Sequence, residues 1–264
     1  MPKVKVNDIN IYYEIHGEGF PLVMIMGLSG NIYWWEDTLI EELSKNFKVV
    51  IFDNRGVGQT DKPAMNYSIK MFCDDTAGLM NELKIERAHV LGISMGGMIA
   101  QELVINYPEK VENLVLCSTH SGMFFWPRLK LKLLKFLMRF KIKTEEDLVD
   151  LSISTIYTKE FIEENPDYIE EVTKRFFKTP TSIKNFNRQL KAILKHNTRK
   201  RLKTIDKNTL IMHGKKDALI SYRHGLLLAD IIPYAKLALF ENTAHALFSQ
   251  EPERVRNTLL KFLI

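Results

Sequence analysis

The sequence has few cysteines, no long apolar run and no metal-binding motif, and each absence excludes a class of protein. Cys73 and Cys117 are the only two cysteines in 264 residues, and neither belongs to a Cys-x-x-Cys or Cys/His cluster. Such isolated cysteines are typical of reduced residues in a core rather than of a disulfide scaffold or a zinc site. The apolar runs are far shorter than the ~20 residues that a membrane helix needs. We therefore expect no structural metal, no disulfide and no stable membrane insertion.

The N-terminus also lacks a targeting signal. The segment 1–6 contains two lysines and no apolar h-region of the kind that a secretory signal requires. No Walker A motif follows a predicted strand, and neither does a Gly-x-Gly-x-x-Gly motif, which argues against a bound nucleotide cofactor. The sequence thus predicts a cytoplasmic protein that needs no cofactor and has no nucleic-acid partner.

Positive charge is unevenly distributed along the chain. Residues 122–205 contain 19 Lys/Arg and 10 Asp/Glu, whereas the rest of the chain contains 18 and 22. A positive field of this kind favours anionic substrates or anionic lipid surfaces. The alternative is a lysine-rich face that is simply solvated.

Short apolar runs alternate with amphipathic stretches over most of the sequence. Apolar runs of four to six residues are typical of strands buried on both faces of a parallel sheet, and their alternation with helices indicates an α/β fold. We predict a mainly parallel, doubly wound sheet. The expected strands are 3–6, 9–14, 22–26, 49–52, 88–91, 114–117, 209–212 and 235–240, and the expected helices are 32–46, 69–84, 98–106, 221–231 and 252–263.

The alternation stops in the middle of the chain. Residues 122–205 contain several amphipathic stretches and no convincing strand. We interpret them as a helical cap inserted into a core formed by residues 1–121 and 206–264. Within the cap, residues 124–143 carry an apolar face surrounded by lysines, which predicts either a helix over the active site or a helix on a membrane surface.

The sharpest local motif is Gly92-Ile93-Ser94-Met95-Gly96-Gly97. It matches Gly-x-Ser-x-Gly and lies between a predicted strand and a predicted helix, which is the context that a nucleophile elbow requires. We therefore predict that Ser94 is a nucleophile. The alternative is a glycine-rich turn in which Ser94 only caps the following helix.

A serine hydroxyl needs a base, and the base needs an orienting carboxylate. Of seven histidines, only His245 follows the last predicted strand and precedes the last helix. Asp217 follows the strand 209–212, which gives the chain order Ser, Asp, His. The loop 118–121 after the preceding strand offers no carboxylate. We predict Asp217 as the acid, with a solvated loop residue as the alternative.

These residues carry a resemblance to a known family. The chain resembles the α/β-hydrolase superfamily along almost its whole length, and in particular its small cap-bearing serine carboxylesterases and related lactonases. The segment 53–61, Asp-Asn-Arg-Gly-Val-Gly-Gln-Thr-Asp, resembles the family loop D-x-R-G-x-G-x-S-D and departs from it only at Thr60. We assign this loop to structure, so Asp53 is not our candidate acid.

The resemblance implies an activity and further site residues. By position, the backbone N–H groups of Leu28 and Met95 form the oxyanion hole. The implied reaction is ester hydrolysis through an acyl-enzyme, without metal or cofactor, on a small-molecule ester or lactone. The same triad also serves a lactonase, a C–C bond hydrolase, a cofactor-free perhydrolase or a slow-turnover ligand receptor. Candidate substrate-pocket residues are Met123, Phe124, Phe125, Trp126 and Phe248.

Overall fold

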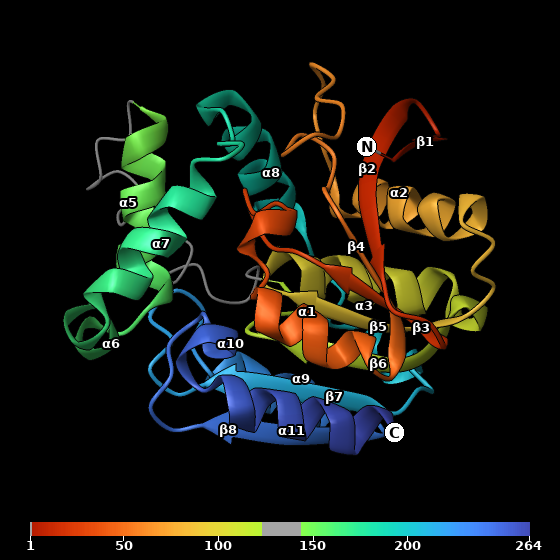
Figure 1. The fold of residues 1–264 in the computed structure, drawn as a ribbon. Coiled ribbons are helices and arrows are strands. Elements are labelled where there is room, and N and C mark those ends of the chain that lie inside the picture. The colour runs from red at the N-terminus through yellow and green to blue at the C-terminus, as the bar shows by residue number, and fades with distance from the viewer. Residues whose placement is uncertain (1, 123–143) are drawn as a thin grey trace.

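One sheet of eight strands forms the centre of the protein in a computed structural model, which describes residues 2–122 and 144–264 (Figure 1). The strand order is β1-β2-β4-β3-β5-β6-β7-β8. Strand β2 pairs antiparallel with β1 and with β4, and the remaining neighbours are parallel. This confirms the mainly parallel sheet. The strands are β1 (Lys3–Val6), β2 (Ile9–His16), β3 (Phe20–Ile25), β4 (Phe47–Phe52), β5 (Ala88–Ile93), β6 (Val111–Cys117), β7 (Thr209–Gly214) and β8 (Ala235–Phe240).

Helices cover both faces of the sheet. Helices α1 (Asp37–Ser44) and α11 (Pro252–Leu263) contribute Leu43 and Leu259 to the apolar cluster on one face. Helices α2 (Ile69–Glu82), α3 (Met95–Asn106) and α9 (Arg223–Ile231) contribute Phe72, Met98 and Leu228 to the cluster on the other. Strands β5 and β7 are buried along their whole length because the sheet is covered on both sides. This burial on both faces explains the continuous apolar runs in their sequences.

Further helices follow β6. They are α5 (Glu145–Ile156), α6 (Lys159–Glu164), α7 (Pro166–Phe176) and α8 (Ile183–Lys195). Figure 1 shows α5, α6 and α7 grouped to one side of the sheet. In the described part of 122–205, the only β pairing is an isolated bridge between Gly122 and Asn197. The division of the chain into a core and a cap remains a prediction.

Two predicted helices have different bounds in the structure. The stretch 32–46 is divided into a 3₁₀ turn, η1 (Ile32–Trp34), and helix α1, because Trp35 between them is extended (φ −74°, ψ 144°). Helix α3 begins at Met95 rather than at residue 98. Ser94 has φ 56°, which no right-handed helix accommodates, so the helix starts directly after it.

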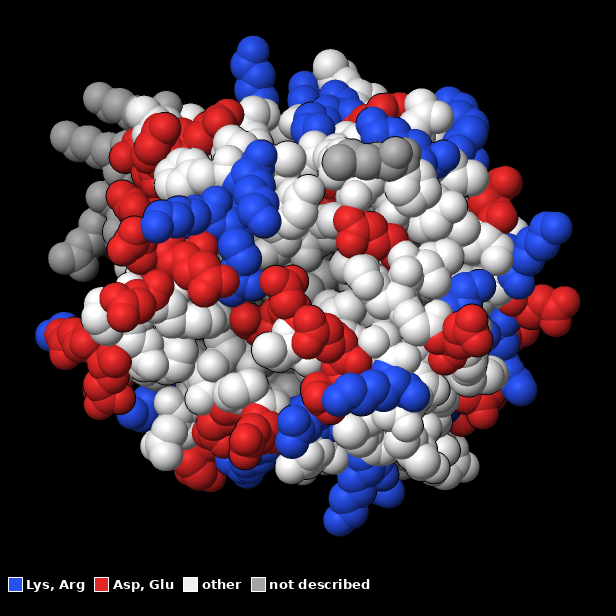
Figure 2. Space-filling view, in the orientation of Figure 1, with Lys and Arg blue, Asp and Glu red and all other residues white. Residues whose placement is uncertain are grey.

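Charge is unevenly distributed within the net-positive segment 122–205. Residues 145–176 hold ten Asp/Glu and three Lys/Arg, whereas residues 178–203 hold nine Lys/Arg and no acid. Figure 2 shows acidic side chains gathered over α5, α6 and α7. The basic amphipathic stretch within 124–143 lies outside the described residues. Among the residues that are described, no helix is long and apolar enough to cross a bilayer.

Candidate active site

Ser94 occupies a strained turn between β5 and α3. Its φ of 56° lies in the left-handed region, which costs a non-glycine residue about 1–3 kcal/mol. The first turn of α3 packs so closely on β3 that a Cβ on Gly96 would lie 2.0 Å from the carbonyl oxygen of Ile25. The Ser94 N–H donates to the carbonyl of Cys117 (2.9 Å), and the hydroxyl of Thr119 donates to the Ser94 carbonyl (2.7 Å). The backbone of Ser94 is thus held from both sides.

Asp217 and His245 form a buried, charge-assisted pair. His245 Nδ1 lies 2.7 Å from Asp217 Oδ2, and Asp217 Oδ1 accepts the backbone N–H groups of Leu219 (2.9 Å) and Ile220 (2.8 Å). Burial by itself would raise the pKa of Asp217, but the charge of His245 and hydrogen bonds from His213 and His245 outweigh it and lower the pKa to about 2. An ionised Asp217 requires the proton on Nδ1 of His245, which leaves Nε2 free to accept one.

His213 is a third member of this group that the sequence analysis did not identify. It lies near the end of β7, with Nε2 donating to the carbonyl of Ile220 (2.8 Å) and 3.4 Å from Asp217 Oδ2. His213 therefore fixes the loop that carries the acid. Its signal in the sequence is weak, because a histidine four residues before an aspartate is equally compatible with an exposed turn.

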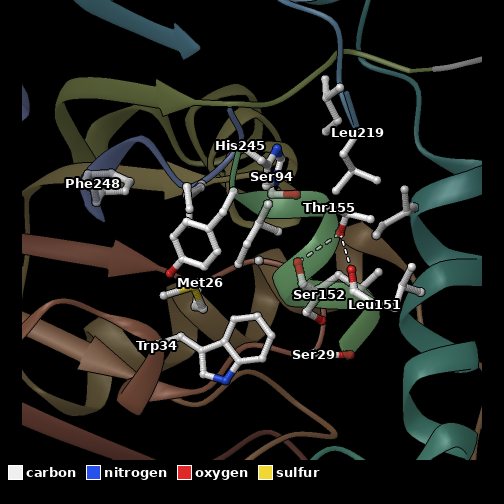
Figure 3. Close-up of a pocket in the computed structure, with 18 of the residues that line it drawn as sticks. Met26, Ser29, Trp34, Ser94, Leu151, Ser152, Thr155, Leu219, His245 and Phe248 are labelled. Carbon is white, nitrogen blue, oxygen red and sulfur yellow. Dashed lines mark hydrogen bonds between the residues drawn. The ribbon is translucent and has the colours of Figure 1, made fainter. Parts of the chain in front are cut away.

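Ser94 and His245 line the same cavity (Figure 3). Ser118, at the end of β6, donates its hydroxyl to the carbonyl of His245 (3.0 Å), which ties the histidine loop to the edge of the sheet that carries Ser94. Within the described residues, no hydrogen bond joins the Ser94 hydroxyl to His245. Hydrogen bonds of this kind often become short only when substrate is bound.

The two predicted oxyanion donors flank Ser94. Leu28 follows Gly27, at which a Cβ would lie 3.0 Å from the Ser94 Cβ and 3.6 Å from its Oγ. Met95 is the residue after Ser94 and is fully buried. Among the described residues, neither the Leu28 N–H nor the Met95 N–H donates to a protein group. Two free N–H groups beside a serine hydroxyl suit a developing oxyanion.

The cavity is mostly apolar. Its volume is about 170 Å³, comparable to the roughly 150 Å³ apolar cavity that binds a benzene ring. The described residues that line it include no Lys, Arg, Asp or Glu. Phe248, predicted for the pocket, lies in this lining, whereas the predicted pocket residues Met123, Phe124, Phe125 and Trp126 lie outside the described residues.

Several lining residues were not identified from the sequence. Trp34 and Trp35 both line the cavity, and Trp34 stacks on Phe176 of α7 with ring centroids 3.7 Å apart. Helix α8 presents an apolar row with spacings of four and three residues, a helical period that the sequence does contain. That row consists of Phe186, Leu190 and Ile193.

Three further histidines lie close together near the cavity. The ring centroid of His120 is 5.5 Å from that of His224 and 6.4 Å from that of His196. Burial lowers the pKa of all three, that of His196 to about 4. The described residues contain no group of three or more His, Cys, Asp or Glu side chains placed to hold a metal ion. These imidazoles are therefore neutral at pH 7 and extend the uncharged surroundings of the triad.

Comparison with known proteins supports the fold. The family model described as "alpha/beta hydrolase fold" matches residues 21–252. Carbamate hydrolase RutD of Azorhizobium caulinodans, as that protein is named, is 29% identical over 99% of this chain and 98% of its own length.

Solved structures show the same fold. An enol-lactonase from Burkholderia xenovorans LB400 superposes with a TM-score of 0.87 at 24% identity and covers 99% of each chain. Est816, described as an enzyme that degrades N-acyl homoserine lactones, superposes with a TM-score of 0.83 at 26% identity, covering 99% of this chain and 100% of that one.

We expect buried His196 to make the protein less stable as the pH falls from about 6.5 toward 4. The folded protein keeps this group neutral down to a pKa of about 4, whereas the unfolded chain binds a proton at the ordinary value of 6.5. Because the unfolded state then binds more protons, the free energy of unfolding declines through this window, by roughly 2–3 kcal/mol at pH 4.5.

Urea unfolding at pH 7.5 and pH 4.5 measures this effect. In His196→Gln the free energy of unfolding should decrease less between the two pH values than it does in the wild type. His16→Gln, which changes a partly exposed residue at the end of β2, should show the wild-type decrease. An identical drop in stability in wild type and His196→Gln would contradict the assignment.

Proposed function

Since the chain belongs to the alpha/beta-hydrolase family, we propose that it is a serine hydrolase that cleaves carboxylic esters through an acyl-enzyme. The observation that carries the proposal is the 2.7 Å contact between His245 and a buried, ionised Asp217. His245 lines the same cavity as the strained Ser94. A buried carboxylate is costly unless it is paired. Its pairing with a histidine next to a free serine hydroxyl is the arrangement that activates a nucleophile.

The proposed reaction has two acyl-transfer steps. His245 Nε2 takes the proton of Ser94 as the Ser94 oxygen bonds to the ester carbonyl carbon, and the N–H groups of Leu28 and Met95 hold the oxyanion. The imidazolium of His245, stabilised by Asp217, then gives its proton to the leaving alcohol as the C–O bond breaks. A water attacks the acyl-enzyme, its proton passes through His245 back to Ser94, and the carboxylic acid leaves.

The cavity favours an uncharged, apolar substrate of small to medium size. No described lining residue carries a charge that would pair with an ionic group of the substrate, and about 170 Å³ accommodates roughly one benzene-sized group. A carbamate anion, the kind of group that the name of the curated relative suggests, would lack a cationic partner among these residues. Neutral esters fit the lining better.

A lactone is the second candidate substrate. The specific observation in its favour is the description of Est816 as a lactone-degrading enzyme, because that neighbour covers 99% of this chain. A lactone is a cyclic ester, so the same steps open its ring, and the leaving alcohol stays attached to the product.

We also propose that residues 122–205 act as a cap, because α5, α7 and α8 supply one wall of the cavity.

Hydrolysis of p-nitrophenyl esters from C2 to C12 tests the proposed activity. We expect steady turnover that is fastest for acyl chains of about six carbons or fewer, because longer chains exceed the cavity. Ser94→Ala should lose on the order of 10³-fold or more. An unchanged rate of hydrolysis in Ser94→Ala would overturn the proposal. A burst of about one product per chain followed by near silence would indicate a slow-turnover receptor instead.

Asp217→Asn should reduce kcat by about 10³–10⁴-fold while the protein stays folded, because an amide no longer selects the Nδ1–H tautomer of His245. Asp206→Asn, which neutralises an exposed carboxylate just before β7, is the control and should retain full activity. The double variant Ser94→Ala/His245→Ala should be little slower than either single variant, because the residues act as one unit. Full activity of Asp217→Asn would rule out Asp217 as the acid.

A further inference from the structure

The loop that follows β3 contains a second residue in the left-handed region. The Gly30 N–H donates to the carbonyl of Gly27 (3.3 Å), which closes a four-residue turn with Leu28 and Ser29 at its centre. Ser29, the third residue, has φ 62°. Turns that need a positive φ at this position usually have glycine there. A serine in this place needs outside support to keep its conformation.

Helix α8 and the loop that precedes it supply that support. The Ser29 N–H donates to Oε1 of Gln189 (2.8 Å), and the Ser29 carbonyl accepts the hydroxyl of Thr181 (2.9 Å). Both backbone polar groups of this one strained residue are thus bonded to side chains more than 150 residues away. Next to it, the Asn31 amide donates to the carbonyl and hydroxyl of Thr179 (3.1 and 3.0 Å).

Gln189 bridges two loops of the sheet. It is fully buried on α8, and while its oxygen accepts from Ser29, its Nε2 donates to the carbonyl of Arg55 (3.1 Å). Arg55 is itself fixed by two hydrogen bonds to Asp75 and two to Asp8. A buried amide bonded at both ends is a rigid link, because leaving either end unpaired costs about 1–3 kcal/mol. The inserted segment is therefore fastened to the loop beside Ser94.

We propose that Gln189, together with Thr181, is a positioning residue that holds the turn Gly27–Gly30 so that the Leu28 N–H points at the oxyanion. The inference rests on the proposed function and adds a role for the inserted segment: besides lining the cavity, it sets the geometry of the oxyanion hole. Neither side chain needs to touch the substrate. Ser29 adjoins Leu28, so a relaxation of its φ out of the left-handed region changes the turn that carries the donor.

The test is Gln189→Leu, which keeps the volume of the side chain and removes both hydrogen bonds. We expect kcat for the best p-nitrophenyl ester to fall 10- to 100-fold, somewhat less than the 10²–10³-fold for outright loss of one oxyanion donor, with KM changed less than threefold. Thr181→Val should act in the same direction and serves if Gln189→Leu folds poorly. Gln101→Leu is the matched control: it is equally buried and bonded at both ends, to His120 and Thr198, and should keep kcat.

A trifluoromethyl ketone separates positioning from general damage, because it forms a tetrahedral oxyanion on the nucleophile. Its Ki should rise in Gln189→Leu by the factor by which kcat/KM falls, while inhibition by the matching alcohol stays unchanged. An unchanged kcat in both Gln189→Leu and Thr181→Val would overturn this inference and leave the proposed function standing. An equal weakening of inhibition by the ketone and by the alcohol would do the same. Wild-type protein without Ser94-dependent turnover would instead overturn the proposed function.

Discussion

The close contact between β3, β5 and the start of α3 is the constraint on which the site depends. It forces Ser94 into a left-handed turn, and the same contact leaves room only for glycine at residue 96. The strain of about 1–3 kcal/mol at Ser94 is tolerated because hydrogen bonds from β6 and its following loop hold the backbone on both sides. As a result the Ser94 hydroxyl lies at the same edge of the sheet as Gly27 and His245.

The electrostatics of the site follow from burial. Asp217 stays ionised in a buried position because His213, His245 and two backbone N–H groups compensate the lost solvation. The neighbouring histidines are kept neutral by burial, and the described cavity lining is uncharged. Asp217 is therefore the nearest counter-charge for an imidazolium on His245. In a mostly apolar cavity this ion pair is stronger than it would be in water, and so are hydrogen bonds from the N–H groups of Leu28 and Met95 to an oxyanion.

The sequence predicts the parts of this arrangement that are encoded locally. Alternating apolar runs and amphipathic stretches predict the parallel sheet, and the glycine pattern around Ser94 predicts the turn, because strand, turn and helix are adjacent in the chain. The long-range contacts are different: Trp34 stacks on Phe176, and Gln189 accepts from Ser29 across 160 residues. They depend on how the inserted segment packs over the sheet, which no periodicity of 2 or 3.6 residues records.

The central claim is that Ser94 is an activated nucleophile. Reaction with a fluorophosphonate followed by peptide mapping tests it most directly, because such reagents bond only to serines whose hydroxyl is deprotonated by a neighbouring base. The cavity provides its own controls in Ser29, Ser152 and Ser249, which share the surroundings and lack the triad. The account predicts one adduct per chain, on Ser94, that disappears in His245→Ala. An unmodified protein, or an adduct on one of the other three serines, would contradict it.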